Sequence, residues 1–157
     1  MKKILSILIL LILLSISITS CTIKPTDIPI TKKKPNNYYY TNLLAQSIKD
    51  DNSPKITLFE INLHKDKDLP KEGIENLLGF FKNIKQRNFI NKPTILPSKP
   101  QFKMYIITRG EKYVINVYNE KFISIYPWDG VYSMDYIDTT NLYTLYNLYG
   151  LCKYYFK

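Results

Sequence analysis

The sequence has few of the residues that build common catalytic sites. Its only histidine is His64, which excludes a His-Glu-x-x-His zinc motif and leaves too few imidazoles for a histidine-based metal cage. Its five glycines form neither a Gly-x-Ser-x-Gly nucleophile elbow nor a phosphate-binding loop. We therefore predict no catalytic residues, no cofactor and no metal, and we favour binding over catalysis.

Arginine is also scarce. The 157 residues include 22 basic side chains and carry a formal charge of +9, yet only Arg87 and Arg109 are arginines. Proteins that read DNA grooves or clamp phosphates favour arginine, because its guanidinium donates two parallel hydrogen bonds. The lysine-rich composition is typical of an AT-rich genome, and we predict no nucleic-acid partner.

A long apolar run occurs only at the start of the chain. Lys2 and Lys3 precede an almost wholly apolar stretch from Ile4 to Ile16. A basic start, an apolar segment and then small residues describe an export signal. The run is shorter than the ~20 residues that a membrane-spanning helix needs. We therefore assign residues 1–20 to a signal peptide.

The tetrad Ile18-Thr19-Ser20-Cys21 follows the apolar run. It resembles the lipobox of bacterial lipoproteins, in which the cysteine thiol is diacylglycerylated and becomes the first residue of the mature chain. The resemblance implies a lipid anchor at Cys21, labelling by palmitate, and a location on the extracellular face of the cell membrane. The membrane is then the first partner, and a cell-wall polymer or an envelope protein is the second.

The other cysteine is Cys152. If Cys21 carries lipid, Cys152 has no partner for an internal disulfide, so the fold must depend on its core. A Cys152–His64 pair could in principle act as nucleophile and base. Cys152, however, falls on the apolar stripe of a predicted helix, where cysteine packs as a small hydrophobic side chain.

The mature chain divides into a tether and one domain. Residues 21–37 contain Pro25, Pro29 and Pro35 without apolar periodicity, which is typical of an extended, flexible tether. Residues 38–157 are long enough for one domain with one core and too short for two.

Apolar spacing predicts the elements of this domain. A first helix should begin after Asn37 and end near Lys49, and a second should run from Glu72 to Arg87. Between them, Lys55 to His64 alternates as a strand with Thr57, Phe59, Ile61 and Leu63 on one side, and Lys65 to Leu69 is a charged loop.

Four antiparallel strands then follow the proline-rich residues 91–101: Phe102–Thr108, Tyr113–Tyr118, Phe122–Tyr126 and Val131–Ile137. A last helix, capped within Asp138–Thr140, carries an apolar stripe that ends at Phe156.

The order of elements predicts an α+β fold. We expect a four- to five-strand antiparallel meander with a helix packed across it and helices at both ends. This order is similar to the cystatin-like and NTF2-like cone folds, a likeness that implies no function. Through its lipobox and the segment Tyr126-Pro127-Trp128-Asp129-Gly130, the chain also resembles uncharacterised small lipoproteins of low-GC Gram-positive bacteria.

Aromatic side chains suggest where a ligand could bind. One face of the meander is apolar, and the other carries Lys103, Tyr105, Asn116, Tyr118, Ser124, Tyr126, Ser133 and Asp135. Aromatic rings among hydroxyl and amide groups suit a sugar or a peptide, because the rings can stack on the ligand and the polar groups can fix its orientation by hydrogen bonds. The alternative is that the C-terminal helix covers this face, or that it is simply a solvated tyrosine-rich surface. The candidate ligand surface is Tyr105, Asn116, Tyr118, Tyr126 and Trp128.

Trp128 has two interpretations. Pro127 and Gly130 predict a turn that the chain leaves with positive φ at the glycine. The indole ring either folds back to close the end of the core, which we favour, or points outward and joins the tyrosines.

Two other functions stay open from the sequence. A small envelope enzyme could act on cell-wall glycan or peptide through carboxylates such as Glu60, Asp129 and Asp135. A surface immunity or inhibitor protein is the other.

The lipid anchor can be tested by the substitution Cys21→Ala. We expect it to abolish palmitate labelling and to release the protein from membranes, because stable anchoring needs more than one acyl chain. Cys152→Ala is the matched control and should keep both properties. A Cys21→Ala protein that stays bound in high salt without detergent would refute the lipobox assignment.

Overall fold

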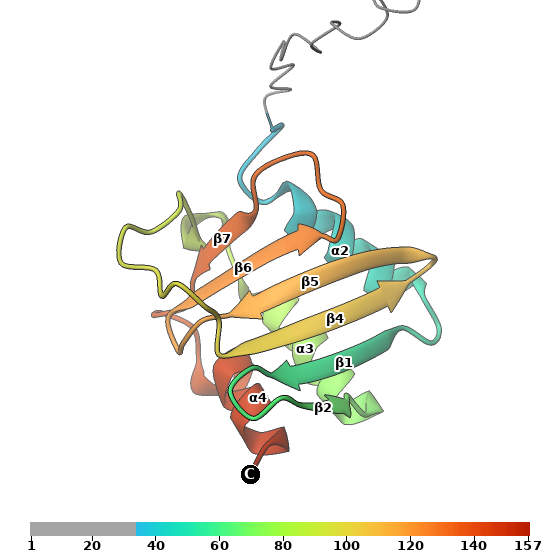
Figure 1. Ribbon diagram of the computed structural model, residues 1–157. Coiled ribbons are helices and arrows are strands. Elements are labelled where there is room, and N and C mark those ends of the chain that lie inside the picture. Colours follow the sequence, from blue (N-terminus) through green and yellow to red (C-terminus); the bar gives the residue numbers. More distant parts are fainter. Residues whose placement is uncertain (1–33) are drawn as a thin grey trace, which may run out of the picture. The chain divides into compact units, whose positions relative to one another are not determined.

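The computed structural model describes residues 34–157, so the predicted signal peptide, Cys21 and most of the predicted tether lie outside the described part. Within it, seven strands form one open antiparallel sheet in the order β2-β1-β4-β5-β6-β7-β3, and three α-helices lie on the far side of that sheet in Figure 1. The helices are α2 (Tyr39–Asp50), α3 (Lys71–Asn83) and α4 (Leu148–Tyr155). The strands are β1 (Lys55–Glu60), β2 (Lys65–Asp68), β3 (Phe89–Ile90), β4 (Phe102–Thr108), β5 (Glu111–Val117), β6 (Phe122–Pro127) and β7 (Asp135–Asp138).

The α+β class and the antiparallel meander are confirmed, with seven strands in place of four or five. Strand β4 has the predicted bounds, and the proline-rich segment before it contains no regular element. The likeness to the cystatin-like and NTF2-like folds stays a prediction.

The core lies between the sheet and the three helices. Along β4, Phe102, Met104 and Ile106 are buried toward the helices, while the residues between them face the other way. Each fully buried apolar side chain of this size stabilises the fold by about 1.5–3 kcal/mol. The helices contribute Leu44, Ile48, Leu77, Phe80, Leu148 and Cys152 to the same cluster.

The segment after β1 differs from the prediction. Strand β1 ends at Glu60, a turn follows, and Lys65–Asp68 pairs with β1 as the edge strand β2 instead of forming a loop. The two faces of β1 are also exchanged: Ile56 and Leu58 are buried, whereas Phe59 lies on the side away from the helices. The apolar alternation from Thr57 to Leu63 continues past the end of β1 at Glu60 into the turn. It therefore does not indicate which face of the strand is buried. Alternating charges suit β2, because an exposed edge strand is protected from pairing with other chains by charged side chains.

The C-terminal region also differs. A short 3₁₀ turn, η3 (Thr144–Tyr146), precedes α4, so the helix begins later than predicted. Its N-cap is Asn147, whose side-chain oxygen accepts hydrogen bonds from the backbone N–H groups of Tyr149 and Gly150. The carboxylate of Asp138, predicted as a cap, instead accepts from Thr140 within a local turn.

Asp135 ties strand β7 to the N-terminal part of the domain. The sequence placed it on the solvated face, but its pairing with Ile125 turns it toward the helices, where it is completely buried. One carboxylate oxygen accepts from the backbone N–H and the hydroxyl of Thr41, at 2.7 and 2.8 Å. The other forms an ion pair with Lys34, which also donates to the carbonyl of Met134. Asp135 therefore accepts a hydrogen bond from a backbone N–H in the first turn of α2.

We predict that Asp135→Ala strongly destabilises the domain. It would leave the Lys34 ammonium without its counter-charge and the backbone N–H of Thr41 without a partner in a buried site, which typically costs about 3–5 kcal/mol. The free energy of unfolding in urea measures this loss. Asp138→Ala is the control, because that carboxylate serves only a local turn, and it should cost about 1 kcal/mol or less. Equal losses for both variants would contradict a special role for Asp135.

Candidate functional site

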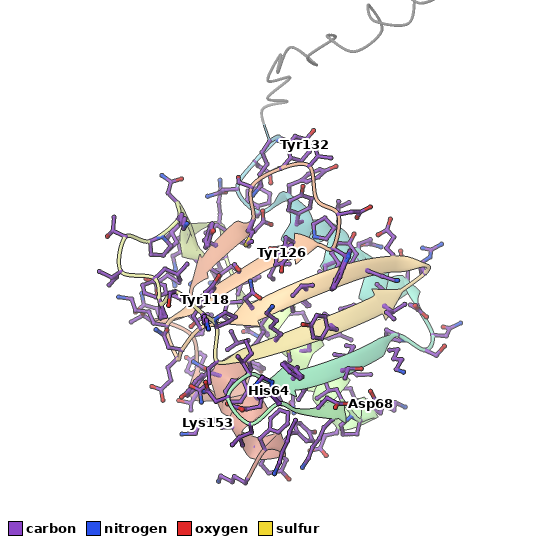
Figure 2. All side chains as sticks on the ribbon, in the orientation of Figure 1. His64, Asp68, Tyr118, Tyr126, Tyr132 and Lys153 are labelled. Atoms are coloured by element: carbon purple, nitrogen blue, oxygen red, sulfur yellow. The ribbon has the colours of Figure 1, made fainter. Side chains whose placement is uncertain are left out.

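The face of the sheet away from the helices, which we call the open face, carries the residues predicted to bind a ligand. In the strand register, Tyr105, Val114 and Tyr126 lie side by side across β4, β5 and β6. Figure 2 shows Tyr118 and Tyr126 on the viewer's side of the sheet. Helix α4 packs against the opposite face, with Cys152 in the core, so the alternative that this helix covers the tyrosines is wrong.

Aromatic rings form a row across the open face. The ring centroids of Phe59 and Tyr105 are 6.4 Å apart, and those of Tyr105 and Trp128 are 6.2 Å apart. Tilted and edge-on contacts at this separation are attractive. Val114 lies between Tyr105 and Tyr126 in the register and is only 1% exposed, although it belongs to this face. The side chains around Val114 therefore shield the sheet beneath them.

Trp128 points outward. Its side chain is 65% exposed, so the interpretation that it closes the end of the core is wrong. Gly130 is not in the positive-φ region either; among the described glycines only Gly110 is, at φ 83°. A Cβ on Gly130 would lie 3.0 Å from the ring of Pro127 and 3.2 Å from the hydroxyl of Tyr40. Glycine suits this position because the chain passes close to its neighbours.

A short line of polar groups runs beside the rings. Asn116 donates to the hydroxyl of Ser124 at 3.1 Å, and the hydroxyl of Tyr118 lies 3.5 Å from the same atom. Asn116 is only 4% exposed, and its carbonyl oxygen has no hydrogen-bond partner among residues 34–157. Burial raises the pKa of Tyr126, and the amide of Asn116 partly offsets this effect. The phenol of Tyr126 is therefore a neutral donor at physiological pH.

The structure separates two of the three candidate carboxylates, Glu60 and Asp135. Glu60 accepts from the backbone N–H of Leu63 at the end of β1, and Asp135 is buried on β7. Three strands separate β1 from β7, which at 4.8 Å per strand spacing puts the two side chains roughly 19 Å apart. Asp129 is exposed in the loop after β6. Glycoside hydrolysis needs carboxyl groups within about 10 Å, so Glu60 and Asp135 do not form such a pair.

Cys152 and His64 are also separated. Cys152 is fully buried in the core between α4 and the sheet, and burial raises the pKa of its thiol to about 12. His64 lies in the turn before β2, with its ring 6.3 Å from that of Phe59 on the open face. The sheet lies between the two side chains, so the histidine cannot act as a base for this thiol.

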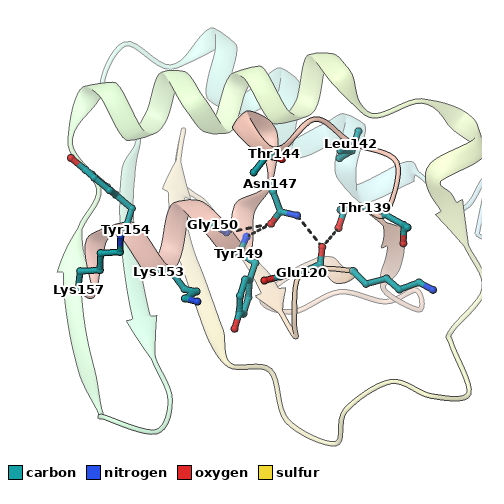
Figure 3. A pocket seen from close by; sticks show the side chains of 12 residues that line it. Glu120, Thr139, Leu142, Thr144, Asn147, Tyr149, Gly150, Lys153, Tyr154 and Lys157 are labelled. Carbon is teal, nitrogen blue, oxygen red and sulfur yellow. Dashed lines mark hydrogen bonds between the residues drawn. The ribbon is translucent and has the colours of Figure 1, made fainter.

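A cavity of about 730 Å³ lies beside α4 (Figure 3). Its polar groups are already paired with one another: the side chain of Asn147 and the hydroxyl of Thr139 both donate to the backbone carbonyl of Glu120. Lys121 and Lys153 also line the cavity. None of the predicted site residues lines it, and its inner hydrogen bonds mainly hold the start of α4 against the β5–β6 turn.

In residues 34–157, no group of three or more His, Cys, Asp or Glu side chains is arranged to hold a metal ion. Within the same range, no helix has the length and apolarity to cross a membrane.

Comparison with known proteins places the chain in a family. Residues 34–152 match the domain of unknown function DUF4883. The chain belongs to the DUF4883 family. A chain from Clostridium perfringens, whose crystal structure is described as that of a candidate lipoprotein, is 32% identical to this chain with a TM-score of 0.71. The alignment covers 78% of this chain and 98% of the other, and the resemblance to uncharacterised lipoproteins is thereby confirmed. None of the curated proteins matches this DUF4883 protein.

Sequence reasoning missed one aromatic residue of the open face. Phe59 was expected on the core side of its strand, yet its ring makes an edge-on contact with Tyr105 at the end of the row. Ile56 and Leu58 carried the necessary signal, because these two apolar residues alternate with Thr57 and Phe59 and fill the core.

The burial of Cys152 gives a prediction about its reactivity. Because the thiol is protonated and inaccessible, maleimide should not label it in the native protein and should label it after denaturation. Cys152→Ala should cost about 1–2 kcal/mol of unfolding free energy through lost core contacts. The control is Cys21→Ala, which leaves Cys152 as the only cysteine and simplifies the labelling. Rapid native labelling would restore a redox or nucleophilic role.

Proposed function

We propose that this DUF4883 protein is a lipid-anchored binding module on the outer face of the cell membrane, and that its open face binds a glycan of the cell envelope. The anchor is Cys21, and residues 1–20 are the signal peptide. The tether then holds the domain within reach of the cell wall.

The lipid anchor has two supports. The tetrad Ile18-Thr19-Ser20-Cys21 matches the lipobox pattern, and the relative from Clostridium perfringens is named as a candidate lipoprotein. The excess of lysine over acidic residues adds attraction toward anionic envelope polymers and lipid head groups.

The binding role depends mainly on one observation, which is that all three helices of the described part pack on one side of the sheet. The other side keeps a row of rings that includes the 65% exposed Trp128. An exposed aromatic row of this kind usually marks an interaction site. A glycan suits it better than an apolar peptide does, because a pyranose ring is flat and can stack on an aromatic ring while its hydroxyls bond to polar neighbours.

The distribution of carboxylates favours binding over hydrolysis. Glu60 and Asp135 are held by other hydrogen bonds and lie far apart on the helix side of the sheet. Neither faces the aromatic row, so a glycan stacked there would meet neither of these two acids.

The open face can be tested with Trp128→Ala. The anchored protein, solubilised in detergent, should lose about tenfold in affinity for purified cell-wall glycan, equal to about 1.4 kcal/mol. Its melting temperature should change little, because the ring lies outside the core.

Tyr154→Ala is the matched control, because Tyr154 is 68% exposed and Trp128 is 65% exposed, but Tyr154 belongs to α4 on the other side of the sheet. It should leave glycan binding unchanged. Equal effects of the two substitutions, or unchanged binding after Trp128→Ala, would rule out the open face as the glycan site and leave an envelope protein as the partner to be sought.

A further inference from the structure

The middle of the open face contains a buried side-chain amide, Asn116, whose carbonyl oxygen accepts no hydrogen bond from the described residues. Asn116 is 4% exposed, and its Nδ2 donates to the Ser124 hydroxyl. Its Oδ1 has no hydrogen-bond partner in the described part of the chain. A buried acceptor without a partner destabilises the fold, so such groups in native proteins call for an explanation. A ligand that brings a donor to this oxygen is one.

The surroundings of Asn116 restrict that ligand. Lys103 and Ser124 are its direct cross-strand neighbours, and Val114 and Tyr118 lie two residues away on the same face. Tyr126 is opposite Val114, one diagonal step from Asn116. The site therefore combines an acceptor, phenol hydroxyls that can donate, and aromatic rings, with no carboxylate among these five neighbours.

An acetamido group matches each of these features. Its N–H is a donor for the amide oxygen, its carbonyl is an acceptor for a phenol hydroxyl, and its methyl group can rest on an aromatic ring. A plain hydroxyl donates and accepts through a single oxygen, so it cannot place donor and acceptor on separate atoms, and it has no methyl group. We propose that the open face binds a glycan whose sugars carry acetamido groups, with the amide N–H donated to Asn116 Oδ1. This inference rests on the function proposed above and names its class of ligand.

Access to the oxygen requires a small rearrangement. Tyr118 and Tyr126 are half-buried rings beside Asn116, and neither belongs to the core cluster. Neither ring is fully buried, so turning one ring aside can admit the acetamido group without moving the sheet. The displaced ring can then pack against the sugar.

The test compares two probes and two variants. The probes are the β-1,4-linked hexamer of N-acetylglucosamine and the matching hexamer of glucose, which lacks the acetamido groups. Both are titrated against the anchored, detergent-solubilised protein. We expect the acetylated hexamer to bind at least tenfold more tightly, because a site built around a polar contact discriminates against ligands that cannot make it.

The first variant is Asn116→Leu combined with Ser124→Ala, which removes both partners of the 3.1 Å hydrogen bond and keeps a similar volume at position 116. Removing an unpaired acceptor together with its neighbour should leave the melting temperature unchanged or raised. Affinity for the acetylated hexamer should fall about tenfold, while affinity for the glucose hexamer should not change. Asn42→Leu is the control, because Asn42 is exposed on α2 on the other side of the sheet.

Three outcomes would overturn the inference: equal affinity for the two hexamers, no binding of either, or unchanged binding after the Asn116 substitution. The second variant, Trp128→Ala, distinguishes a failure of the acetamido inference from a failure of the proposed glycan binding. If the two hexamers bind equally and Trp128→Ala weakens the binding of both, the open face binds glycans but does not select acetamido groups. If it has no effect on either, the open face is not the glycan site at all.

Discussion

Packing of α2, α3 and α4 against one face of the sheet is the interaction on which the rest of the structure depends. Apolar side chains from all three helices meet those of the central strands in one cluster, in which Leu44, Leu77 and Met104 are completely buried. Burial of apolar area is the main favourable term in folding. Within residues 34–157, no helix packs on the other face. That face can therefore hold polar and aromatic side chains without weakening the core.

The two faces treat buried polar groups differently. On the helix side, Asp135 is completely buried and both of its carboxylate oxygens have partners. Thr41 donates hydrogen bonds to one oxygen, and Lys34 forms an ion pair with the other. On the open face, Asn116 is almost as buried, yet its carbonyl oxygen has no partner in the described residues. The first arrangement is what a structural tie requires, since it joins segments 94 residues apart. The carbonyl oxygen of Asn116 can still accept a hydrogen bond from a ligand, and it lies among aromatic rings on which a sugar can stack.

Most elements could be predicted from local pattern. The helix that became α3 and the strand that became β4 both carry an apolar periodicity that only one structure satisfies. The errors arose where the local signal was short or misleading. The exposed strand β2 contains only Lys and Asp, and the two residues of β3 have no periodicity at all. Pairing with a neighbouring strand, which no local window contains, decides both.

The sequence by itself determined the two-faced pattern of the central strands and led to the predictions of an export signal and of a lipid site at Cys21, because each is a local arrangement of residues. It also grouped Tyr105, Asn116 and Tyr126, since alternation along a strand fixes which residues share a face. Only the tertiary structure decided which face the helices cover, where Asp135 points and whether Trp128 is exposed. These depend on contacts between residues far apart in the chain, and such contacts leave no periodic signal in the sequence.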